Sequence, residues 1–198
     1  MFEIVHQSLE DLDAVEALLD ISFGPDRMKK TAYRLREGVE PVGQLSFVAR
    51  KDGELVGTIR FWPIVIKSET AQPPQRLPAL LLGPIAVEPS LKGQGIGMGL
   101  MRTGLAAAKG MGAKIIVLVG DASYYSRVGF SRGPAEGLRM PGPVDPERLL
   151  ALELEPGALA GVAGPIGKAK GAKAKTIAAL PKRPAPVRRS HRRAVARG

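Results

Sequence analysis

The segment LGPIAVEPSLKGQGIGMGLM, residues 82–101, constrains the fold of this chain more than any other stretch. It joins an almost wholly apolar run at 79–87 to an amphipathic stretch at 97–109, and a second apolar run follows at 115–119. Apolar runs of this kind are typical of strands covered on both faces. Apolar residues that recur at helical spacing indicate a helix between them. The sequence therefore predicts a strand, helix, strand crossover with two parallel strands in one sheet.

Weaker patterns predict the rest of a mixed α/β sheet. We expect a strand at 2–5, helices at 9–22 and 26–37, a hairpin at 45–66 that turns at Asp52-Gly53, a loop at 67–78, a helical turn at 122–128, a strand that opens at Phe130 and a last strand at 149–154. Ser8 is expected to cap the first helix, with Asp11 completing an approximate capping box. Gly83-Pro84 interrupts the strand at 79–87, and because proline has no N–H to donate, a bulge or splayed edge is expected there.

Charge divides the chain into two unequal parts. The 198 residues have a net charge of +10, but eleven of the 29 Lys and Arg residues and none of the 19 Asp and Glu residues lie at 166–198. We therefore predict one nearly neutral domain at 1–160 and a basic, low-complexity tail at 161–198 that is disordered in isolation. Residues 166–198 are either simply solvated or drawn non-specifically to nucleic acid or an anionic surface.

Composition also excludes several kinds of site. The chain has no cysteine and two histidines, His6 and His191, at its opposite ends. A disulfide framework and a thiol nucleophile are thus excluded, and no metal site is expected. No apolar segment reaches the roughly eighteen residues of a membrane span, and the N-terminus lacks the pattern of a signal peptide. We expect a cytoplasmic protein of unknown oligomeric state.

Glycines at alternate positions from Gly93 to Gly99 indicate a phosphate-binding loop. Without Cβ atoms a ligand can approach the backbone N–H groups, and the following helix adds unpaired N–H groups and the positive end of its dipole. The spacing fits neither the P-loop nor the dinucleotide fingerprint G-x-G-x-x-G. The pattern [QR]-x-x-G-x-[GA] does fit, with Lys92 in its first place.

This loop, together with GDASYYSRVGF at 120–130, resembles the GNAT superfamily of acyl-CoA-dependent N-acyltransferases, and is closest to the bacterial branch with a G-D-x-x-Y-Y-x-R-x-G-F segment. The resemblance covers about residues 2–155. Lys92 stands where Arg or Gln is usual, which keeps the charge but loses the planar fork. The resemblance implies a mixed, mostly antiparallel central sheet flanked by helices, with a splayed parallel strand pair that forms the acyl-CoA slot.

The resemblance also implies roles for individual residues, with acetyl-CoA as cosubstrate. The pantetheine arm would lie along the strand, the loop N–H groups would hold the pyrophosphate, and Lys92 would add a charge. The implied cofactor-binding residues are Ile85, Ala86, Val87, Lys92, Gly93, Gln94, Gly95, Ile96, Gly97, Met98 and Gly99. Tyr125, four residues before the glycine of Y-x-x-x-G-F, is the implied general acid for the leaving thiolate, with Tyr124 as the weaker candidate.

Two functions remain open at this point. The first is an N-acetyltransferase that moves an acetyl or other short acyl group to a primary amine through a tetrahedral intermediate. The second is an acyl-CoA-binding regulatory module with a degenerate active site, targeted to nucleic acid by the basic tail. No carboxylate lies within 79–87, and Glu88 is the nearest candidate base. Water-relayed deprotonation, or a substrate amine of lowered pKa, would serve instead. Residues 20–40 and 63–78 are expected to shape the acceptor site, but they carry no readable pattern for the acceptor.

Simpler structural roles compete for some of these residues. Tyr125 could be a packed core tyrosine, and Asp121 is interpreted as the N-cap of the short helix. Arg127 is interpreted as a surface or salt-bridge residue. Trp62 is either core or acceptor-site wall.

Overall fold

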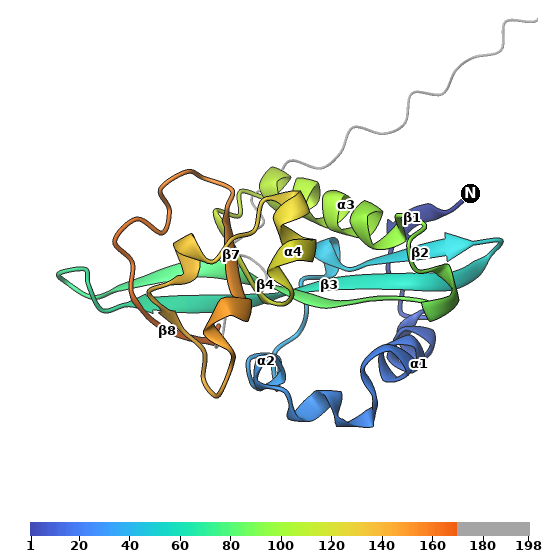
Figure 1. Ribbon diagram of the computed structural model, residues 1–198, viewed down its shortest axis with the longest axis horizontal. Coiled ribbons are helices and arrows are strands. Elements are labelled where there is room, and N and C mark those ends of the chain that lie inside the picture. The colour runs from blue at the N-terminus through green and yellow to red at the C-terminus, as the bar shows by residue number, and fades with distance from the viewer. Residues whose placement is uncertain (170–198) are drawn as a thin grey trace, which may run out of the picture.

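Helices cover both faces of one central sheet (Figure 1). The computed structural model describes residues 1–169. Within them eight strands join into one sheet: β1 (Glu3–His6), β2 (Phe47–Lys51), β3 (Glu54–Ser68), β4 (Gln75–Val87), β5 (Ile115–Val119), β6 (Leu138–Arg139), β7 (Leu149–Glu153) and β8 (Gly164–Lys168). The α-helices are α1 (Leu12–Phe23), α2 (Thr31–Arg34), α3 (Ile96–Gly110) and α4 (Ala122–Tyr125), and a 3-10 turn at Pro25–Lys29 links α1 to α2.

The strand order confirms a mixed, mostly antiparallel sheet. Its main path runs β1-β2-β3-β4-β5-β7, in which only β4 and β5 are parallel. Helix α3 makes the crossover between these two strands, as the sequence predicts. The beginning of β3 pairs with β2, and its far end pairs with β8 on the same edge. The long hairpin of β3 and β4 therefore supplies the central strands of the sheet, and the shorter strands pair along its two edges (Figure 1).

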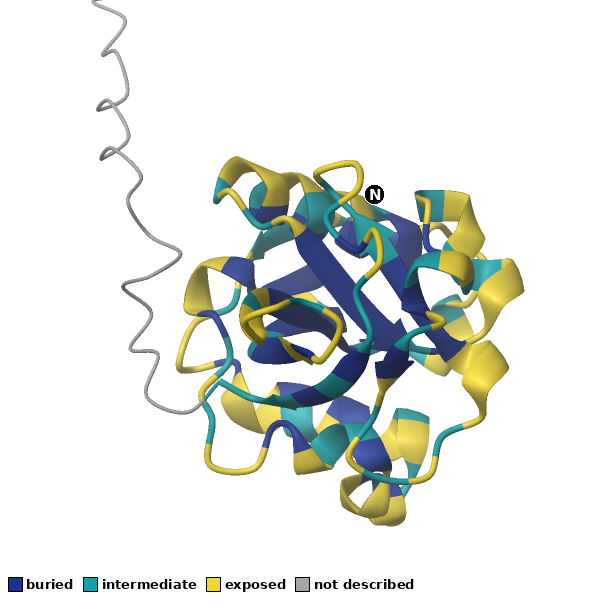
Figure 2. Cartoon of the chain, turned by 90° about the vertical axis from the view of Figure 1, so that its left-hand side faces the viewer, coloured by how far each residue is buried: buried dark blue, intermediate teal, exposed yellow. Residues whose placement is uncertain are grey.

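Two helices bury their apolar stripes on opposite faces of this sheet. Helix α3 places Leu100 and Met101 against Phe61 of β3, and all three are fully buried. Helix α1 places Val15 and Leu19 in a separate cluster on the other side. Full burial of an apolar side chain of this size contributes about 1.5–3 kcal/mol. Figure 2 shows the result, with buried strands at the centre and exposed residues on the outer helices and loops.

A bulge interrupts β4 at Gly83-Pro84, where the sequence predicts one. The register between β3 and β4 shifts between Ile59 and Phe61, because β4 there carries two residues opposite Arg60. Gly83 has a φ of +115°, a conformation that residues with a Cβ rarely adopt. The bulge thus depends on glycine at this position.

The bulge also changes which side chains of β4 face α3. Before it, Leu80 and Leu82 belong to the cluster under α3; after it, Ile85 and Val87 do. In a regular strand the side chains of even-numbered residues lie on one face and those of odd-numbered residues on the other. The extra residue of the bulge shifts this alternation by one, from even to odd. The bulge therefore decides which residues the end of β4 presents.

Strands β4 and β5 separate soon after they pair. Their register contains Leu80 opposite Ile116 and Leu81 opposite Val117, and no later pair, although β5 continues beside β7 to Val119. The last residues of β4 pair only with β3 on their other edge. The splayed parallel pair that the resemblance implies is therefore present.

The N-terminal helices differ from the prediction. Helix α1 begins at Leu12 rather than residue 9, and Asp11 occupies its N-cap position. The Ser8 N–H donates to the Asp11 carboxylate at 2.8 Å, so one half of the expected capping box forms. The predicted helix at 26–37 is wrong: the chain makes the 3-10 turn and only one turn of α2.

The strands extend further than their composition suggests. The predicted loop at 67–78 is wrong at both ends, because β3 continues to Ser68 and β4 already begins at Gln75. The strand expected from Phe130 is reduced to a single bridge between Ser131 and Ala151. The prediction of a last strand at 149–154 places β7 correctly but misses the strand that follows it.

Strand β8 belongs to the range expected as tail. It pairs with Ile64–Ile66 of β3, and its Ile166 side chain is buried in the core. The sheet therefore continues past residue 160, where we expected the domain to end. Residues 170–198, which carry most of the basic tail, lie outside the described residues. None of the helices that the structure describes is long and apolar enough to cross a bilayer.

Candidate active site

A groove of about 390 Å³ lies where the end of β4 meets the start of α3. Its lining includes every sequence-predicted site residue except Gln94 and Gly99. Ser22 and Phe23 at the end of α1 close it on one side, and Tyr124 and Arg127 contribute from the segment around α4. The splayed end of β4, the glycine loop and the tyrosine pair therefore meet in one place.

The first turn of α3 supplies the backbone donors of this groove. The helical ladder begins with the Gly99 N–H, which donates to the Gly95 carbonyl at 2.9 Å. Within residues 1–169, the N–H groups of Ile96, Gly97 and Met98 have no backbone acceptor, as the first turn of a helix leaves them. Together with the positive end of the helix dipole, they suit an anion with several acceptor oxygens.

Two members of the predicted set, Gln94 and Gly99, do not line the groove. Gly99 has its N–H engaged and packs against Phe2 and Ile4, so that its lack of a side chain serves contact with β1. The Gln94 N–H donates to the Leu91 carbonyl at 3.3 Å. The set of donors open to a phosphate is narrower than the sequence implies.

Two cations line the groove beside these donors. Lys92 is one of them, as predicted. Arg127 is the other, and it makes no ion pair within the described part of the chain. The interpretation of Arg127 as a surface residue is correct for its exposure, but it misses this position at the groove.

The two tyrosines take different positions. The Tyr124 hydroxyl lies over Gly97, where an added Cβ would be only 2.5 Å away. Tyr125 packs edge-on against Phe130, with ring centroids 6.1 Å apart, and lines both the groove and a second cavity. Burial, with a smaller effect of neighbouring Tyr124, raises the pKa of Tyr125 to about 12. Its hydroxyl therefore keeps its proton at neutral pH.

The second cavity, of about 510 Å³, lies beside the bulge of β4. The 3-10 turn after α1, helix α2, residues 81–85 of β4 and residues 143–148 form its walls. Part of the segment 20–40 lines this cavity, whereas 63–78, the other segment expected to shape an acceptor site, does not. The loop at 143–148 takes their place, and no pattern in its sequence indicates this.

Among residues 1–169, no side chain that lines these cavities is placed as a general base. Asp145 is the one acidic residue among those that line the second cavity, and its carboxylate caps the Glu147 N–H at 3.0 Å. Glu88 lines neither the groove nor the second cavity. Four cations, by contrast, line the second cavity: Lys29, Lys30, Arg36 and Arg148. Residues 1–169 contain no cluster of three or more acidic or histidine side chains that could hold a metal ion.

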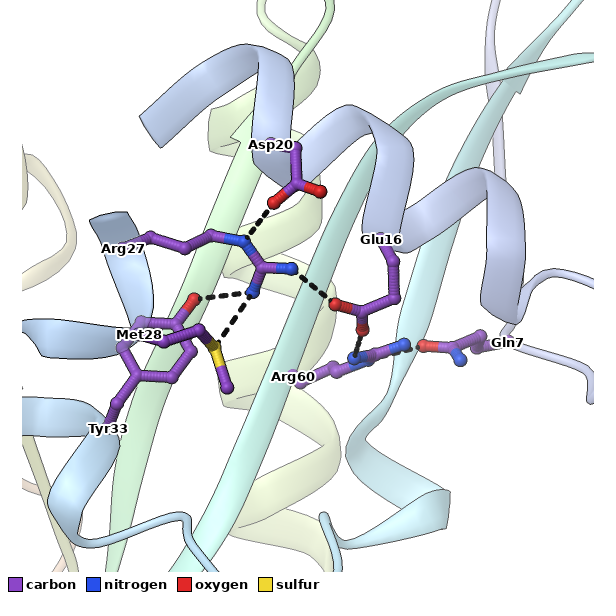
Figure 3. Close-up of polar contacts among 7 residues, drawn as sticks. All are labelled: Gln7, Glu16, Asp20, Arg27, Met28, Tyr33 and Arg60. Carbon is purple, nitrogen blue, oxygen red and sulfur yellow. Dashed lines mark hydrogen bonds and ion pairs between the residues drawn. The ribbon is translucent and has the colours of Figure 1, made fainter. Parts of the chain in front are cut away.

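A network of ion pairs lies next to the second cavity and reaches its wall through Tyr33 (Figure 3). The Glu16 carboxylate accepts from Arg27 at 2.6 Å and from Arg60 at 2.8 Å. Arg27 also donates to Asp20 at 2.7 Å and to the Tyr33 hydroxyl at 3.0 Å. The network thereby ties α1 to β3 and positions Tyr33 of α2 beside the bulge.

This combination of fold and groove defines a class of protein, and comparison with known families agrees. Residues 12–130 match the family described as acetyltransferase (GNAT) family, and the chain belongs to this family. Among curated proteins it is similar to the uncharacterized N-acetyltransferase YhbS of Escherichia coli K12, with 31% identity over 155 residues, which cover 78% of this chain and 88% of that protein.

Solved structures give the same result. The crystal structure of E. coli YhbS in complex with CoA matches with 29% identity and a TM-score of 0.69, covering 84% of this chain and 89% of that chain. A GNAT acetyltransferase from Brucella melitensis in complex with acetyl-CoA matches with 27% identity and a TM-score of 0.53, covering 77% and 96% of the two chains.

Proposed function

We propose that this protein transfers an acetyl or other short acyl group from acyl-CoA to a primary amine. The observation that carries the proposal is that Tyr125 lines both the groove with the unpaired backbone N–H groups and the second, cationic cavity. The groove would hold CoA and the second cavity the acceptor. The CoA and acetyl-CoA complexes of the two similar proteins support acyl-CoA as the donor.

The residues of the groove fit CoA in three respects. Ile85 to Val87 lack a strand partner on the β5 side, so their backbone can pair with the pantetheine amides. The unpaired N–H groups at the start of α3 would bind the pyrophosphate. The positive charges of Lys92 and Arg127 would attract the phosphates of CoA. The Val87 N–H is the candidate to polarise the thioester carbonyl.

The proposed reaction is a direct attack. The amine nitrogen forms a bond to the thioester carbonyl carbon, and the tetrahedral intermediate collapses with loss of the C–S bond. Tyr125 gives its proton to the departing thiolate, and the proton released by the amine passes to solvent. A cavity with four cationic side chains disfavours an ammonium ion and lowers the pKa of the acceptor amine. This would replace the general base that the site lacks.

Two measurements on the purified chain test the proposal. Calorimetric titration should show binding of CoA and acetyl-CoA, and thiol release from acetyl-CoA should require an added amine. Absence of any affinity for CoA would contradict the proposal. Binding without turnover on any amine of a broad panel would favour the regulatory-module alternative. Contact of residues 166–198 with nucleic acid, and a cytoplasmic location, remain proposals; most of that segment lies outside the described residues.

A further inference from the structure

Arg36, which follows α2, is a buried cation that lacks an anionic partner. Its exposed fraction is 8%. Within the described residues it takes part in no ion pair, and its Nε is enclosed with no hydrogen-bond partner. An enclosed charge of this kind is destabilising unless something compensates it. The feature therefore calls for a partner that is not part of the folded chain.

The guanidinium lies beside the bulge of β4. It stacks over the Tyr33 ring at 4.5 Å from the centroid and lies 5.9 Å from the Trp62 ring. Its Nη2 is 3.2 Å from the position that a Cβ on Gly83 would take, so glycine at the bulge makes room for it. Arg36 lines the acceptor cavity together with Tyr125. A group bound to Arg36 would thus occupy the cavity in which the amine must sit.

The carboxylates around Arg36 are already engaged with other cations. Glu16 binds Arg27 and Arg60, and Asp20 binds Arg27 (Figure 3). Glu37, the next residue in the chain, pairs with Lys168 at 3.1 Å. Burial lowers the pKa of Arg36 to about 10, so it stays charged at neutral pH. No carboxylate of the described residues therefore neutralises Arg36, and a ligand in the cavity could do so.

We propose that the acceptor amine also carries a carboxylate, and that Arg36 binds this carboxylate while the amine points toward Tyr125. The inference rests on the proposed acyl transfer and specifies its substrate class. A planar guanidinium that lies over aromatic rings matches a carboxylate bidentately, which gives orientation as well as affinity. A cavity of about 510 Å³ is of the size that holds small molecules. Binding the carboxylate would also compensate the buried charge.

The first experiment compares matched substrates on the unmodified protein. Thiol release from acetyl-CoA is measured with unbranched ω-amino acids, from glycine to 6-aminohexanoate, and with the primary amide of each. The members of a pair have the same length and differ in the negative charge. We expect kcat/KM to favour the acid over its amide roughly 10- to 100-fold at the chain length that fits the cavity. Equal rates within every pair would overturn the inference.

The second experiment uses variants and a readout other than turnover. Trp62 is the single tryptophan of the chain and lies near the guanidinium. Its fluorescence should change saturably with the preferred ω-amino acid but not with the matching amide. Arg36→Gln should abolish this response and the preference for acids, and Arg36→Lys should retain part of both. Arg102→Gln, at an exposed position of α3, makes the same change in net charge and should leave both intact.

The outcomes separate the two proposals. Failure to bind CoA, or thiol release with no amine, would reject acyl transfer and with it the substrate class. Turnover that ignores the carboxylate, or an Arg36→Gln variant that keeps the preference and binds CoA normally, would reject only the role of Arg36. Should Arg36→Gln fail to fold, the matched pairs on the unmodified chain still decide.

Discussion

A single substitution at Tyr125 distinguishes its role in packing from its proposed role as proton donor. Tyr125→Phe removes the hydroxyl but keeps the ring that packs on Phe130 and Gly120. Because the thiolate would then leave without a proton donor, we expect kcat for acetyl transfer to fall roughly 10²- to 10⁴-fold. CoA affinity should stay near that of the unmodified protein, as steady-state kinetics and calorimetry can check. Tyr124→Phe, the same change one residue away, should affect kcat far less. An unchanged kcat in Tyr125→Phe would exclude its hydroxyl as the acid.

Glu16 makes a stability contribution that depends on pH. Burial opposes its charged form, but hydrogen bonds from Arg60 and Arg27 outweigh this and hold the pKa of Glu16 below its ordinary value of 4.5. A carboxylate with a lowered folded-state pKa stabilises the fold above pH 4.5, and this stabilisation is lost as the pH falls through the lowered value.

We therefore expect Glu16→Gln to lower the free energy of unfolding at pH 7 by roughly 1–2 kcal/mol, a modest value because half-exposed ion pairs are screened by solvent. The difference from the unmodified protein should shrink below pH 4, which urea unfolding at several pH values can follow. Glu10→Gln, at an exposed position without an ion pair among the described residues, is the control. A loss that stays constant with pH would show that Glu16 acts through packing alone.

Within α3, two glycines should respond in opposite ways to alanine. A Cβ at Gly104 would lie 2.6 Å from Cε2 of Phe61, a fully buried ring that cannot move away. A Cβ at Gly97 would clash only with the Tyr124 hydroxyl, the free end of a side chain, and would make an ordinary contact of 3.6 Å with Val87. We expect Gly104→Ala to destabilise the fold by about 1–3 kcal/mol through overpacking. Gly97→Ala should leave stability nearly unchanged and weaken CoA binding instead.

Urea unfolding and CoA titration of both variants distinguish these effects. If Gly97→Ala were the less stable variant, or if Gly104→Ala bound CoA more weakly at unchanged stability, the division of α3 into a packing side and a ligand side would be wrong.

Those elements that depend on a local sequence pattern could be predicted from the sequence. The crossover through α3, the turn at Asp52-Gly53 and the bulge at Gly83-Pro84 each depend on residues close together in the chain. The break of the helix expected at 26–37 could not be predicted, because it depends on contacts with other parts of the fold: Arg27 pairs with Glu16 of α1, and the Thr31 hydroxyl donates to the Pro143 carbonyl. The sequence analysis did not predict strand β8 for a similar reason, because its pairing partner β3 lies about a hundred residues earlier in the chain.

The candidate site divides in the same way. The glycine loop and Tyr125 lie within one continuous region with motif spacing, and ten of the twelve predicted site residues line the groove. The role of Arg36 could not be predicted from its sequence neighbours. Only in the folded chain does it lie beside Gly83, where no carboxylate of the described residues pairs with it. The segment at 143–148 is equally silent in sequence, since its role depends on where β7 returns to the sheet.

For the whole molecule, the main test is whether the sheet truly needs its last strand. Ile166 of β8 is 2% exposed and packs in the cluster at the far end of the β3 and β4 hairpin. We expect Ile166→Ala to lower the free energy of unfolding by about 2–4 kcal/mol, because it leaves a cavity in that cluster. Lys168→Ala, near the end of the same strand, removes a half-exposed ion pair and should cost less than 1 kcal/mol. Equal, small effects would place β8 outside the cooperative unit.

The bulge in β4 makes the number of residues there as important as their identity. Loss of either Gly83 or Pro84 would leave a single residue opposite Arg60, so Ile85 would still pair with Ile59 and every later side chain would keep its face of the sheet. The bulge itself would disappear, and with it the local bend and extra twist that a bulge gives a strand. A deletion here should therefore spare the core under α3 and alter the cavity beside the bulge, whereas loss of Ala86, after the bulge, would turn Val87 to the opposite face.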